Sequence, residues 1–438
     1  MAMLSRRAAL VLMSSLFAAA CAPAAPAQPT AAPKAEAKPS EATKPAAASP
    51  AAAASPVAGS SPAAGASPAA SASPAAAPAA SPGASPASSP APSPAASPAA
   101  GIAVPVAQPT GAWPPARGSV IAQAPAGKTW NLAIVQFVSH PALDATREGA
   151  LKALDDNGFK SGQNLKVDYQ NGQGDVGTVN SIAQRFKDSN PDLVIPIATP
   201  PFQAMLNVSK NDSRPPMVFG AIADPYAAAA GVIKSATDKP AYLTGIQALA
   251  PVEEAMRLAQ TIVPSARRYG IIWNPTEANS EVVTKLAREA APKLGIELVE
   301  QTISKADEVL QAAQALVTKG IDLFFISTDS TVVSAFEAVV KVANENKKPL
   351  IANDPASAGR GAAAALGVDY EQSGYEAGQM AALVLSGQKT TAEIRVERTV
   401  SGFLAVNLAG AAEQGVTFPP EVLAQVRETF RDIVPTKR

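Results

Sequence analysis

The 438-residue sequence predicts an α/β protein with two doubly wound parallel-sheet lobes and a ligand cleft between them, preceded by a long disordered linker. Two observations predict the lobes. From residue 129 onward, apolar β-branched runs alternate with amphipathic segments, which is typical of parallel sheets covered by helices on both faces. The segment 183–199 also recurs as 313–329, a shift of 130 residues. Ligands bind beyond the carboxyl ends of the strands in such sheets, which predicts the cleft.

The expected strands are the apolar runs, and the expected helices are the amphipathic stretches between them. Strands are expected at 131–138, 165–170, 192–199, 217–222, 268–274, 296–303, 322–329, 349–354 and 362–368. Helices are expected at 142–157, 176–188, 202–209, 252–262, 280–294, 307–319, 331–346 and 375–386.

Residues 1–20 are typical of a secretory signal that ends just before a cysteine. A basic pair (Arg6, Arg7) precedes an apolar run of roughly ten residues, too short to span a bilayer, and three alanines supply a cleavage site. Cys21, the only cysteine, follows where a bacterial lipobox has the thiol that is lipidated. Two or more acyl chains would hold the protein on a membrane. The alternatives are an ordinary signal with an incidental cysteine and, for the route, twin-arginine export.

Residues 21–128 are expected to form a disordered tether. The segment is almost entirely Ala, Pro, Ser and Gly, and no charged residue occurs from 45 to 116. A proline every few residues removes backbone donors and disfavours helix before it, so the alanines cannot propagate a helix. Too little apolar area is available to offset the entropy of ordering. Such a chain reaches about 300 Å when fully extended, which suits a domain held away from a membrane.

Composition and charge exclude several classes of function. Lysine plus arginine equal aspartate plus glutamate, at 36 each, so the chain lacks the electrostatic footprint of a nucleic-acid-binding protein. One histidine and one acylated cysteine cannot make a metal cluster, and there is no nucleophile elbow or P-loop lysine. The segment 172–177 fits G-x-G-x-x-G but follows the second strand of its unit, whereas a dinucleotide fingerprint follows the first. We expect no cofactor, no metal and no enzymatic activity.

Short segments at the predicted strand ends resemble the solute-binding proteins of ABC transporters, specifically the TrpX-like group with a type I periplasmic-binding-protein fold. They are 134–144 (IVQFVSHPALD), 168–175, 197–200, 224–225, 273–280 (WNPTEANS), 328–334, 353–354 and 367–370. Together they span residues 130–415 in the family's order. Two positions differ, because Ser139 stands where the family usually has glutamate and Trp273 where it often has tyrosine.

The resemblance implies a protein that captures a small solute by closing two lobes and delivers it to an ABC permease with a cytoplasmic ATPase. It implies three crossovers, with lobe 1 at 129–245 plus 372–396 and lobe 2 at 246–371 plus 397–438. With the lipid anchor, it implies a monomer in the cell envelope, on the outer face of the cytoplasmic membrane. Members of the group are associated with amino acids, aromatic ones included, so the expected solute is an amino acid, with an aromatic or a branched side chain as the alternatives.

A zwitterionic solute needs hydrogen-bond donors for its carboxylate, and unpaired N–H groups at helix starts supply them. Thr199-Pro200 and Asn279-Ser280 lie where a strand has ended and a helix begins. We expect them to contact the solute. Each could also be a helix cap alone, because Ser and Thr hydroxyls accept from the first amides of a helix.

The ammonium group of the solute needs acidic acceptors, and three predicted strands end in aspartate. Asp354, Asp329 and Asp224 are the candidates, with Thr331 beside Asp329 in the same turn. Asp329 also fits a helix N-cap, and Asp224, which precedes a proline, also fits a turn.

Aromatic walls for the cleft are expected from Phe137 and Trp273, which end the first strand of each lobe. Core packing is the alternative for any single aromatic residue. His140, the only histidine, lies on a strand–helix turn and is expected to be a pocket or capping group.

Three other functions stay open at this point. One is a ligand-sensing subunit for a membrane receptor. Another is a sugar or nucleoside binder of the same fold. The third is an envelope enzyme whose reaction is not indicated by any motif in the sequence.

Overall fold

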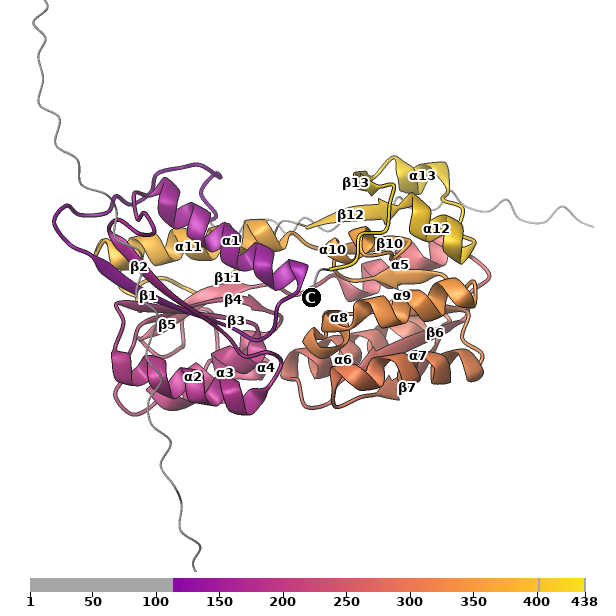
Figure 1. Ribbon diagram of the computed structural model, residues 1–438, viewed down its shortest axis with the longest axis horizontal. Coiled ribbons are helices and arrows are strands. Elements are labelled where there is room, and N and C mark those ends of the chain that lie inside the picture. The colour runs from indigo at the N-terminus through magenta and orange to yellow at the C-terminus, as the bar shows by residue number, and fades with distance from the viewer. Residues whose placement is uncertain (1–112, 401, 437–438) are drawn as a thin grey trace, which may run out of the picture. The chain divides into compact units, whose positions relative to one another are not determined.

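The computed structural model describes residues 113–400 and 402–436; Cys21, the signal at 1–20 and the tether up to residue 112 lie outside the described residues. The described chain forms two mostly parallel sheets with helices between successive strands, which confirms the α/β class (Figure 1). Within that part, every helix is too short or too polar to cross a membrane.

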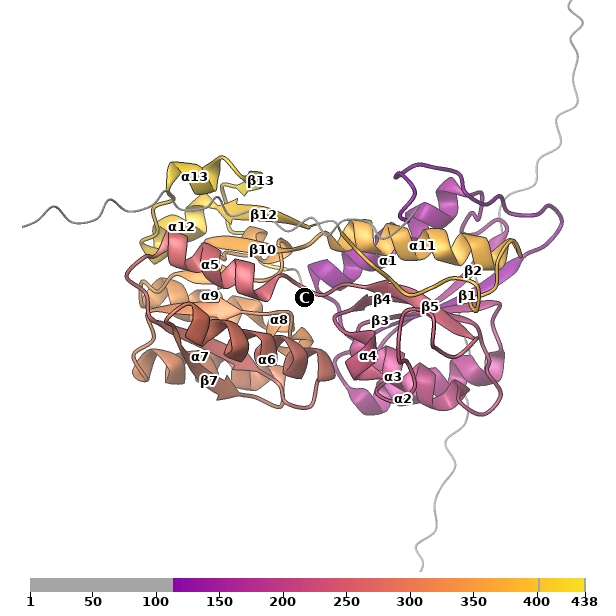
Figure 2. The same ribbon diagram turned by 180° about the vertical axis from the view of Figure 1, so that it is seen from behind.

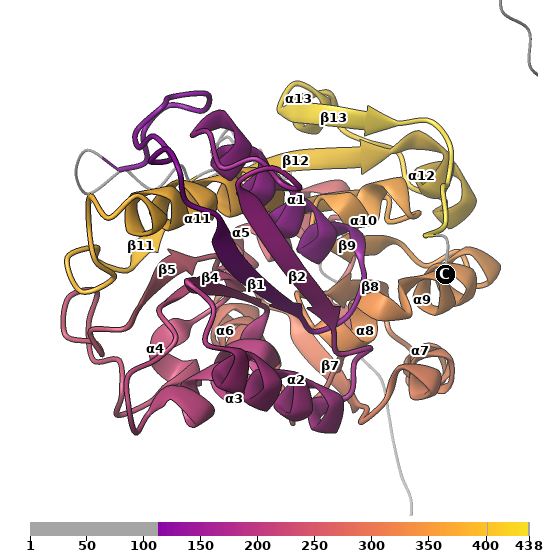
Figure 3. The same ribbon diagram turned by 60° about the vertical axis from the view of Figure 1, so that its left-hand side comes forward.

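The first sheet has the strand order β11-β5-β4-β3-β1-β2, and all its neighbours pair in parallel. Its strands are β1 (Trp130–Gln136), β2 (Leu165–Asn171), β3 (Leu193–Ile197), β4 (Met217–Ile222), β5 (Leu243–Gln247) and β11 (Glu397–Arg398). Helices α1 (Pro141–Asp156) and α11 (Tyr370–Leu385) cover one face, and α2 (Val176–Ser189) and α3 (Thr199–Ser209) cover the other (Figure 3). The short α4 (Pro225–Ala228) follows β4. The strand order reverses beside β1, where doubly wound sheets bind ligands.

The second sheet has the order β13-β12-β10-β9-β8-β6-β7, and only β10 and β12 pair antiparallel. Its strands are β6 (Arg268–Trp273), β7 (Glu297–Thr302), β8 (Leu323–Ile326), β9 (Leu350–Ala352), β10 (Ala364–Val368), β12 (Gly402–Asn407) and β13 (Val426–Phe430). Its helices are α5 (Val252–Ile262), α6 (Ala278–Lys293), η1 (Ala306–Glu308), α7 (Val309–Thr318), α8 (Ser330–Ser334), α9 (Phe336–Glu345), α10 (Ala356–Gly359), α12 (Leu408–Gln414) and α13 (Pro420–Leu423).

Both faces of the second sheet are buried, as the continuous apolar strands predict. Leu323 and Phe325 of β8 pack into one core with α5 and α6, whereas Phe324 and Ile326 pack into the other with α7 and α9. Successive side chains of a strand point to opposite faces, so an unbroken apolar run requires two covered faces.

The chain passes between the two sheets three times, after β5, after β10 and after β11 (Figure 2). The expected crossover positions need correction by about two residues each. Residues 370–371 begin α11, which packs on α1, and 397–398 form β11 of the first sheet, whereas the resemblance places both segments in the second lobe. Backbone pairing is the reason: β11 runs beside β5, and the Thr399 amide continues the ladder by donating to the Gln247 carbonyl at 3.0 Å.

The repeated segments occupy equivalent places in the two sheets. Asp192 precedes β3, and its carboxylate accepts a 2.8 Å hydrogen bond from the Asn131 amide of β1. Asp322 precedes β8, and its carboxylate accepts from the Arg267 and Arg268 amides at the start of β6, at 2.7 and 2.9 Å. In both lobes the repeated aspartate therefore ties the third strand to the first.

Residues 113–128 are ordered on the first lobe, which corrects the expectation that the tether extends to residue 128. The Ile121 and Ala122 amides donate to Oδ1 of Asn157 at 2.8 and 2.9 Å, and the Gly118 amide donates to the Tyr375 hydroxyl at 2.7 Å. Ala122 is buried in the core of this lobe. These polar and apolar contacts offset the entropy of ordering residues 113–128.

Candidate ligand-binding pocket

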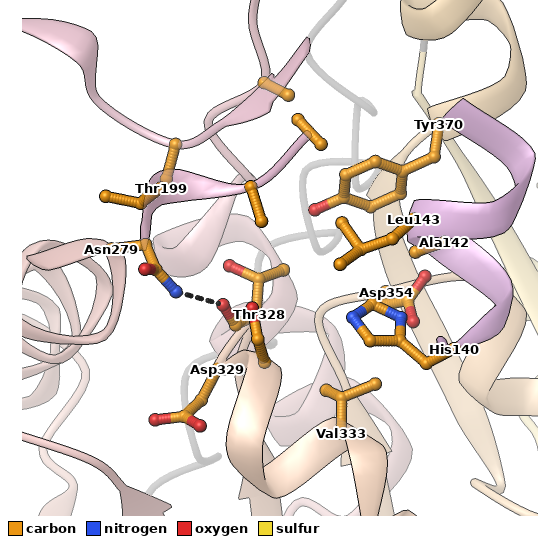
Figure 4. A pocket seen from close by; sticks show the side chains of 15 residues that line it. His140, Ala142, Leu143, Thr199, Asn279, Thr328, Asp329, Val333, Asp354 and Tyr370 are labelled. Carbon is orange, nitrogen blue, oxygen red and sulfur yellow. Dashed lines mark hydrogen bonds between the residues drawn. The ribbon is translucent and has the colours of Figure 1, made fainter. Parts of the chain in front are cut away.

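A pocket of about 420 Å³, open solvent at its mouth included, lies beyond the carboxyl ends of strands from both sheets. The first lobe contributes His140, Ala142, Leu143, Ala198, Thr199, Ala221, Ala223 and Tyr370. The second lobe contributes Asn279, Thr328, Asp329, Ser330, Val333 and Asp354, and the crossover after β5 contributes Ala248. His140, Asp354 and Tyr370 lie on one side, Thr199 and Asn279 on the other, with Thr328 between them (Figure 4).

Four polar atoms in this lining are buried and have no hydrogen-bond partner among the described residues. They are Nδ1 of His140, Oγ1 of Thr199, Oδ1 of Asn279 and Oγ1 of Thr328. The Tyr370 hydroxyl lies near the Thr328 side chain, but the two do not meet the geometry of a hydrogen bond. Buried polar atoms are nearly always paired, and each one left unpaired costs about 1–3 kcal/mol. Four such atoms around one pocket indicate a site whose partners come from a bound molecule.

Asp354 is the pocket carboxylate with accepting capacity left. It is 3% exposed and accepts only two hydrogen bonds, from the Ala356 amide at 3.2 Å and the Ser357 hydroxyl at 3.1 Å. Burial raises the pKa of Asp354, because a low dielectric disfavours its charged form. An ammonium group placed here would relieve that cost.

His140 faces the pocket as a neutral imidazole. Burial, together with the positive charge of Arg360, lowers the pKa of His140 to about 3. Its ring is at the N-cap position of α1, but its side chain caps no amide there. The imidazole is therefore free to exchange a hydrogen bond with a bound molecule at neutral pH.

Asp329, Ser280 and Thr331 form a network that supports the pocket wall. Asp329 accepts from the Asn274 amide, the Ser280 hydroxyl and the Val332 amide at 2.6, 2.6 and 2.8 Å. Its carboxylate points away from Thr199 and Tyr370 (Figure 4). Burial, and then the nearby carboxylate of Glu277, raise the pKa of Asp329.

Glu277 completes this network from the loop before α6. Its two oxygens accept from the Ser330 and Thr331 amides at 3.2 and 3.0 Å, and from the Thr331 hydroxyl. The first amides of α8 are thus satisfied by Glu277 and Asp329. The sequence predicts that Asp329, Ser280 and Thr331 contact the solute, but in the structure their polar groups are paired with one another, with Glu277 and with the backbone.

The first lobe gives the pocket an alanine floor, formed by Ala198, Ala221 and Ala223 with Ala248 of the crossover. Two of these alanines have positive φ angles, 81° at Ala198 and 56° at Ala221. Residues with a Cβ rarely adopt such angles, which cost of order 1–3 kcal/mol and cluster at functional sites. The small side chains leave the space above them for the apolar part of a ligand.

Four other expected contacts lie elsewhere. Phe137 and Trp273 are buried in the cores of the two lobes, and Arg288 stacks on the Trp273 ring at 4.9 Å. Pro200 and Phe137 border a different depression, shared with Asn274 and Lys305. Asp224 caps α4 by accepting from the Tyr226 and Ala227 amides at 2.9 and 3.0 Å. For the two aromatics the reason is side-chain direction, because a residue at a strand end still points to one face of its sheet.

The pocket also contains residues that the sequence interpretation missed, chiefly Tyr370, Thr328, Val333 and the alanines. Tyr370 opens α11 directly after the β10 strand end, and burial raises the pKa of its hydroxyl, so the phenol stays neutral. The strand-end rule that selected Asp354 applies equally to Tyr370 and Thr328. In residues 113–400 and 402–436, no group of three or more His, Cys, Asp or Glu side chains is placed to hold a metal ion.

Comparison with known proteins identifies the family. A family model described as ABC transporter substrate binding protein matches residues 131–430. The chain belongs to the ABC transporter substrate-binding protein family. It is a solute-binding protein and not an enzyme, and proteins of this family are extracytoplasmic. Its two lobes have the periplasmic-binding-protein fold, as expected.

Several relatives are similar over most of their length. A tyrosine-binding protein of Clostridioides difficile is 40% identical over 261 residues, covering 60% of this chain and 74% of that protein. A conserved domain protein from Vibrio cholerae aligns with a TM-score of 0.66 and 36% identity, covering 69% of this chain and all of that structure. A Streptococcus pneumonia ABC domain in complex with L-Trp aligns with a TM-score of 0.64 and 27% identity, with the same coverage. A ligand-free, open substrate-binding protein with adhesive properties from Clostridium difficile gives a TM-score of 0.52 at 35% identity, covering 70% of this chain and all of that one.

Proposed function

We propose that this substrate-binding protein captures an amino acid with a large side chain and delivers it to its ABC permease. One observation carries the proposal: four unpartnered buried polar atoms and a buried carboxylate surround one pocket. The similarity to a tyrosine-binding protein and to a domain in complex with L-Trp supports an aromatic amino acid.

The pocket chemistry fits a zwitterion. The ammonium group pairs with Asp354, whose raised pKa reflects a carboxylate buried without a cation in direct contact. The carboxylate takes hydrogen bonds from the hydroxyls of Thr199 and Thr328. Thr199 is the first residue of α3, and because Pro200 and Pro201 follow it, its own amide is the free N–H of that helix start. The side chain of the amino acid rests on the alanine floor.

Binding closes the two lobes on the solute. Thr199 and the alanine floor belong to the first lobe, whereas Asn279, Thr328 and Asp354 belong to the second. A ligand that contacts both lobes stabilises the closed state relative to the open one, and a ligand that contacts one lobe does not. The crossover after β5 supplies Ala248 to the pocket, and Tyr370 opens α11 just after the crossover that follows β10.

The remaining parts of the proposal rest on the sequence. Residues 1–20 direct export, Cys21 carries the lipid anchor, and the tether lets a monomeric receptor reach its permease from the outer face of the membrane. Conversion of Cys21 to serine should release the protein from the membrane fraction. Retention of that variant in the membrane would exclude lipidation at this residue.

Isothermal titration with L-tyrosine, L-tryptophan, a sugar and a nucleoside tests the solute class. We expect one of the amino acids to bind, and binding of the sugar or the nucleoside alone would refute the proposal. Asp354→Asn should weaken amino-acid binding on the order of 10²–10³-fold, because it removes the charge partner of a buried ammonium group. Its melting temperature should stay close to that of the wild type, since an asparagine oxygen still accepts from the Ala356 amide.

A further inference from the structure

Asn279 brings a side-chain amide of fixed orientation to the ligand pocket. It is the second residue of α6, lines the pocket and is 6% exposed. Its Nδ2 donates two hydrogen bonds of 3.1 Å, one to Oε2 of Glu277 and one to the Thr328 carbonyl; the second is drawn in Figure 4. Its Oδ1, at the other end of the same amide, is buried and has no partner among the described residues.

The surroundings of Asn279 allow only this orientation of its amide. Turning the amide over would place Oδ1 against the Glu277 carboxylate and the Thr328 carbonyl, which are both acceptors, and would lose both hydrogen bonds. Glu277 is itself fixed, because it is 3% exposed and accepts from the Ser330 and Thr331 amides at 3.2 and 3.0 Å. The unpaired end of the amide is therefore the carbonyl oxygen, which accepts a hydrogen bond and cannot donate one.

The other pocket groups already serve the zwitterionic part of an amino acid. In the proposed function the ammonium group pairs with Asp354, on the opposite side of the pocket from Asn279, and the carboxylate meets the threonine hydroxyls (Figure 4). The carboxylate cannot pair with Oδ1 of Asn279, because neither oxygen carries a proton. A donor for Oδ1 must therefore come from the side chain of the solute. The phenol of tyrosine has an O–H and the indole of tryptophan an N–H, whereas phenylalanine and the aliphatic amino acids have neither.

We propose that Asn279 determines specificity by accepting a hydrogen bond from the side-chain O–H or N–H of the solute, so that the protein selects tyrosine or tryptophan over amino acids that lack this donor. A solute without the donor would leave Oδ1 buried and unpaired, and the cost of that unpaired acceptor separates the two classes of amino acid. This inference rests on the proposed function, because it assumes that an amino acid occupies the pocket.

Isothermal titration with pairs of solutes that differ mainly in the donor tests this inference. L-tyrosine is paired with 4-fluoro-L-phenylalanine, in which fluorine replaces the hydroxyl, and L-tryptophan with 3-benzothienyl-L-alanine, in which sulfur replaces the indole N–H. The wild type should bind the donor-bearing member of at least one pair about 10- to 100-fold more tightly than its analogue. Equal affinities within both pairs would overturn the inference and leave the proposed function intact. Binding of none of the four compounds would refute the proposed function and the inference with it.

Asn279→Leu tests whether this residue causes the preference, because leucine is similar in size and has no hydrogen-bonding group. The ratio of the two affinities within a pair should fall close to one, and taking the ratio cancels any loss that both members share. Thr284→Ala, buried on the same helix but outside the pocket lining, is the matched control and should keep the wild-type ratio. Asn279→Ala serves as the second variant if the leucine variant does not fold. An unchanged ratio in a folded Asn279 variant, even with both affinities reduced, would overturn the inference.

Discussion

The hydroxyl of Ser280 donates a 2.6 Å hydrogen bond to Oδ2 of Asp329, and neither side chain is exposed. This bond joins the first turn of α6 to the residue that caps α8. The same oxygen accepts from the Asn274 amide at 2.6 Å, and Oδ1 accepts from the Val332 amide at 2.8 Å. Both residues belong to the support of the pocket wall, so their substitution should change stability more than recognition.

Asp329→Ala should therefore destabilise the protein by about 3 kcal/mol or more, because it leaves the Ser280 hydroxyl and the Val332 amide without their acceptor and leaves the Asn274 amide only its 3.2 Å bond to the Ser280 hydroxyl. Ser280→Ala should cost about 1–3 kcal/mol by removing one bond to a buried carboxylate. Urea unfolding measures both, with Asp354→Asn as the matched control that weakens binding but not the fold. If Asp329→Ala is as stable as the wild type but no longer binds the solute, Asp329 contacts the solute directly.

Much of the architecture could be predicted because burial on both faces forces long apolar strands. The strand expected at 217–222 and the helix expected at 252–262 coincide with β4 and α5. Two of the missed strands, β5 and β13, lack that signal. β5 is short and contains a glycine, and β13 is an edge strand whose residues 427–429 are exposed, so its sequence is polar. Periodicity says little about strands that pack on one side or lie at an edge.

The position of site residues could be predicted better than the direction of their side chains. The strand-end rule selected His140, Thr199 and Asp354, which line the pocket. It also selected Phe137 and Trp273, which point into the cores. The direction of a side chain alternates along a strand, so it depends on the residue at which the strand ends. An error of one residue in that predicted end places the side chain on the opposite face of the sheet. The alanines of the floor could not be recognised as site residues, because they have no functional group and alanine is common throughout the sequence.

The alanine floor predicts a size limit on the solute. Ala223→Leu should lower the affinity for L-tryptophan and L-tyrosine at least about tenfold, because its added carbons occupy the space of the ligand side chain. Ala223 is 5% exposed and lines the pocket. Calorimetry measures the effect, and the exposed Ala392→Leu is the matched control. Equal affinity in the two variants would show that the solute lies elsewhere.

The contact between α1 and α11 depends on glycine. A Cβ at Gly374 would overlap the Thr146 carbonyl, and one at Gly149 would overlap the Glu371 carbonyl. Gly374→Ala should destabilise the protein by about 1–3 kcal/mol through overpacking. The exposed helical Gly177→Ala should instead be neutral or stabilising by up to about 1 kcal/mol. Guanidinium unfolding compares the two, and equal effects would mean that the helices can separate without cost.

Glu376 of α11 lies buried where the crossovers meet. It is 1% exposed, and Oε1 accepts only long hydrogen bonds, from Gln372 at 3.3 Å and from Thr399 at 3.4 Å. Oε2 has no partner among the described residues. Burial, with some repulsion from Asp369 and Glu397, raises the pKa of Glu376 to about 7.

This pKa predicts that stability falls as pH rises. Below the unfolded pKa near 4.5, Glu376 is protonated in both states and contributes no pH dependence. Between that value and about 7 the folded state binds more protons than the unfolded state, so each rise in pH favours unfolding. Above pH 7 the loss of folding stability reaches about 3 kcal/mol, from 1.36 kcal/mol per pKa unit.

Glu376→Gln keeps the shape of the side chain but cannot ionise. The variant should therefore be more stable than the wild type at pH 8 and similar in stability at pH 4.5. Urea unfolding at both pH values tests this, and parallel pH curves for the two proteins would mean that the carboxylate is hydrated in the folded state.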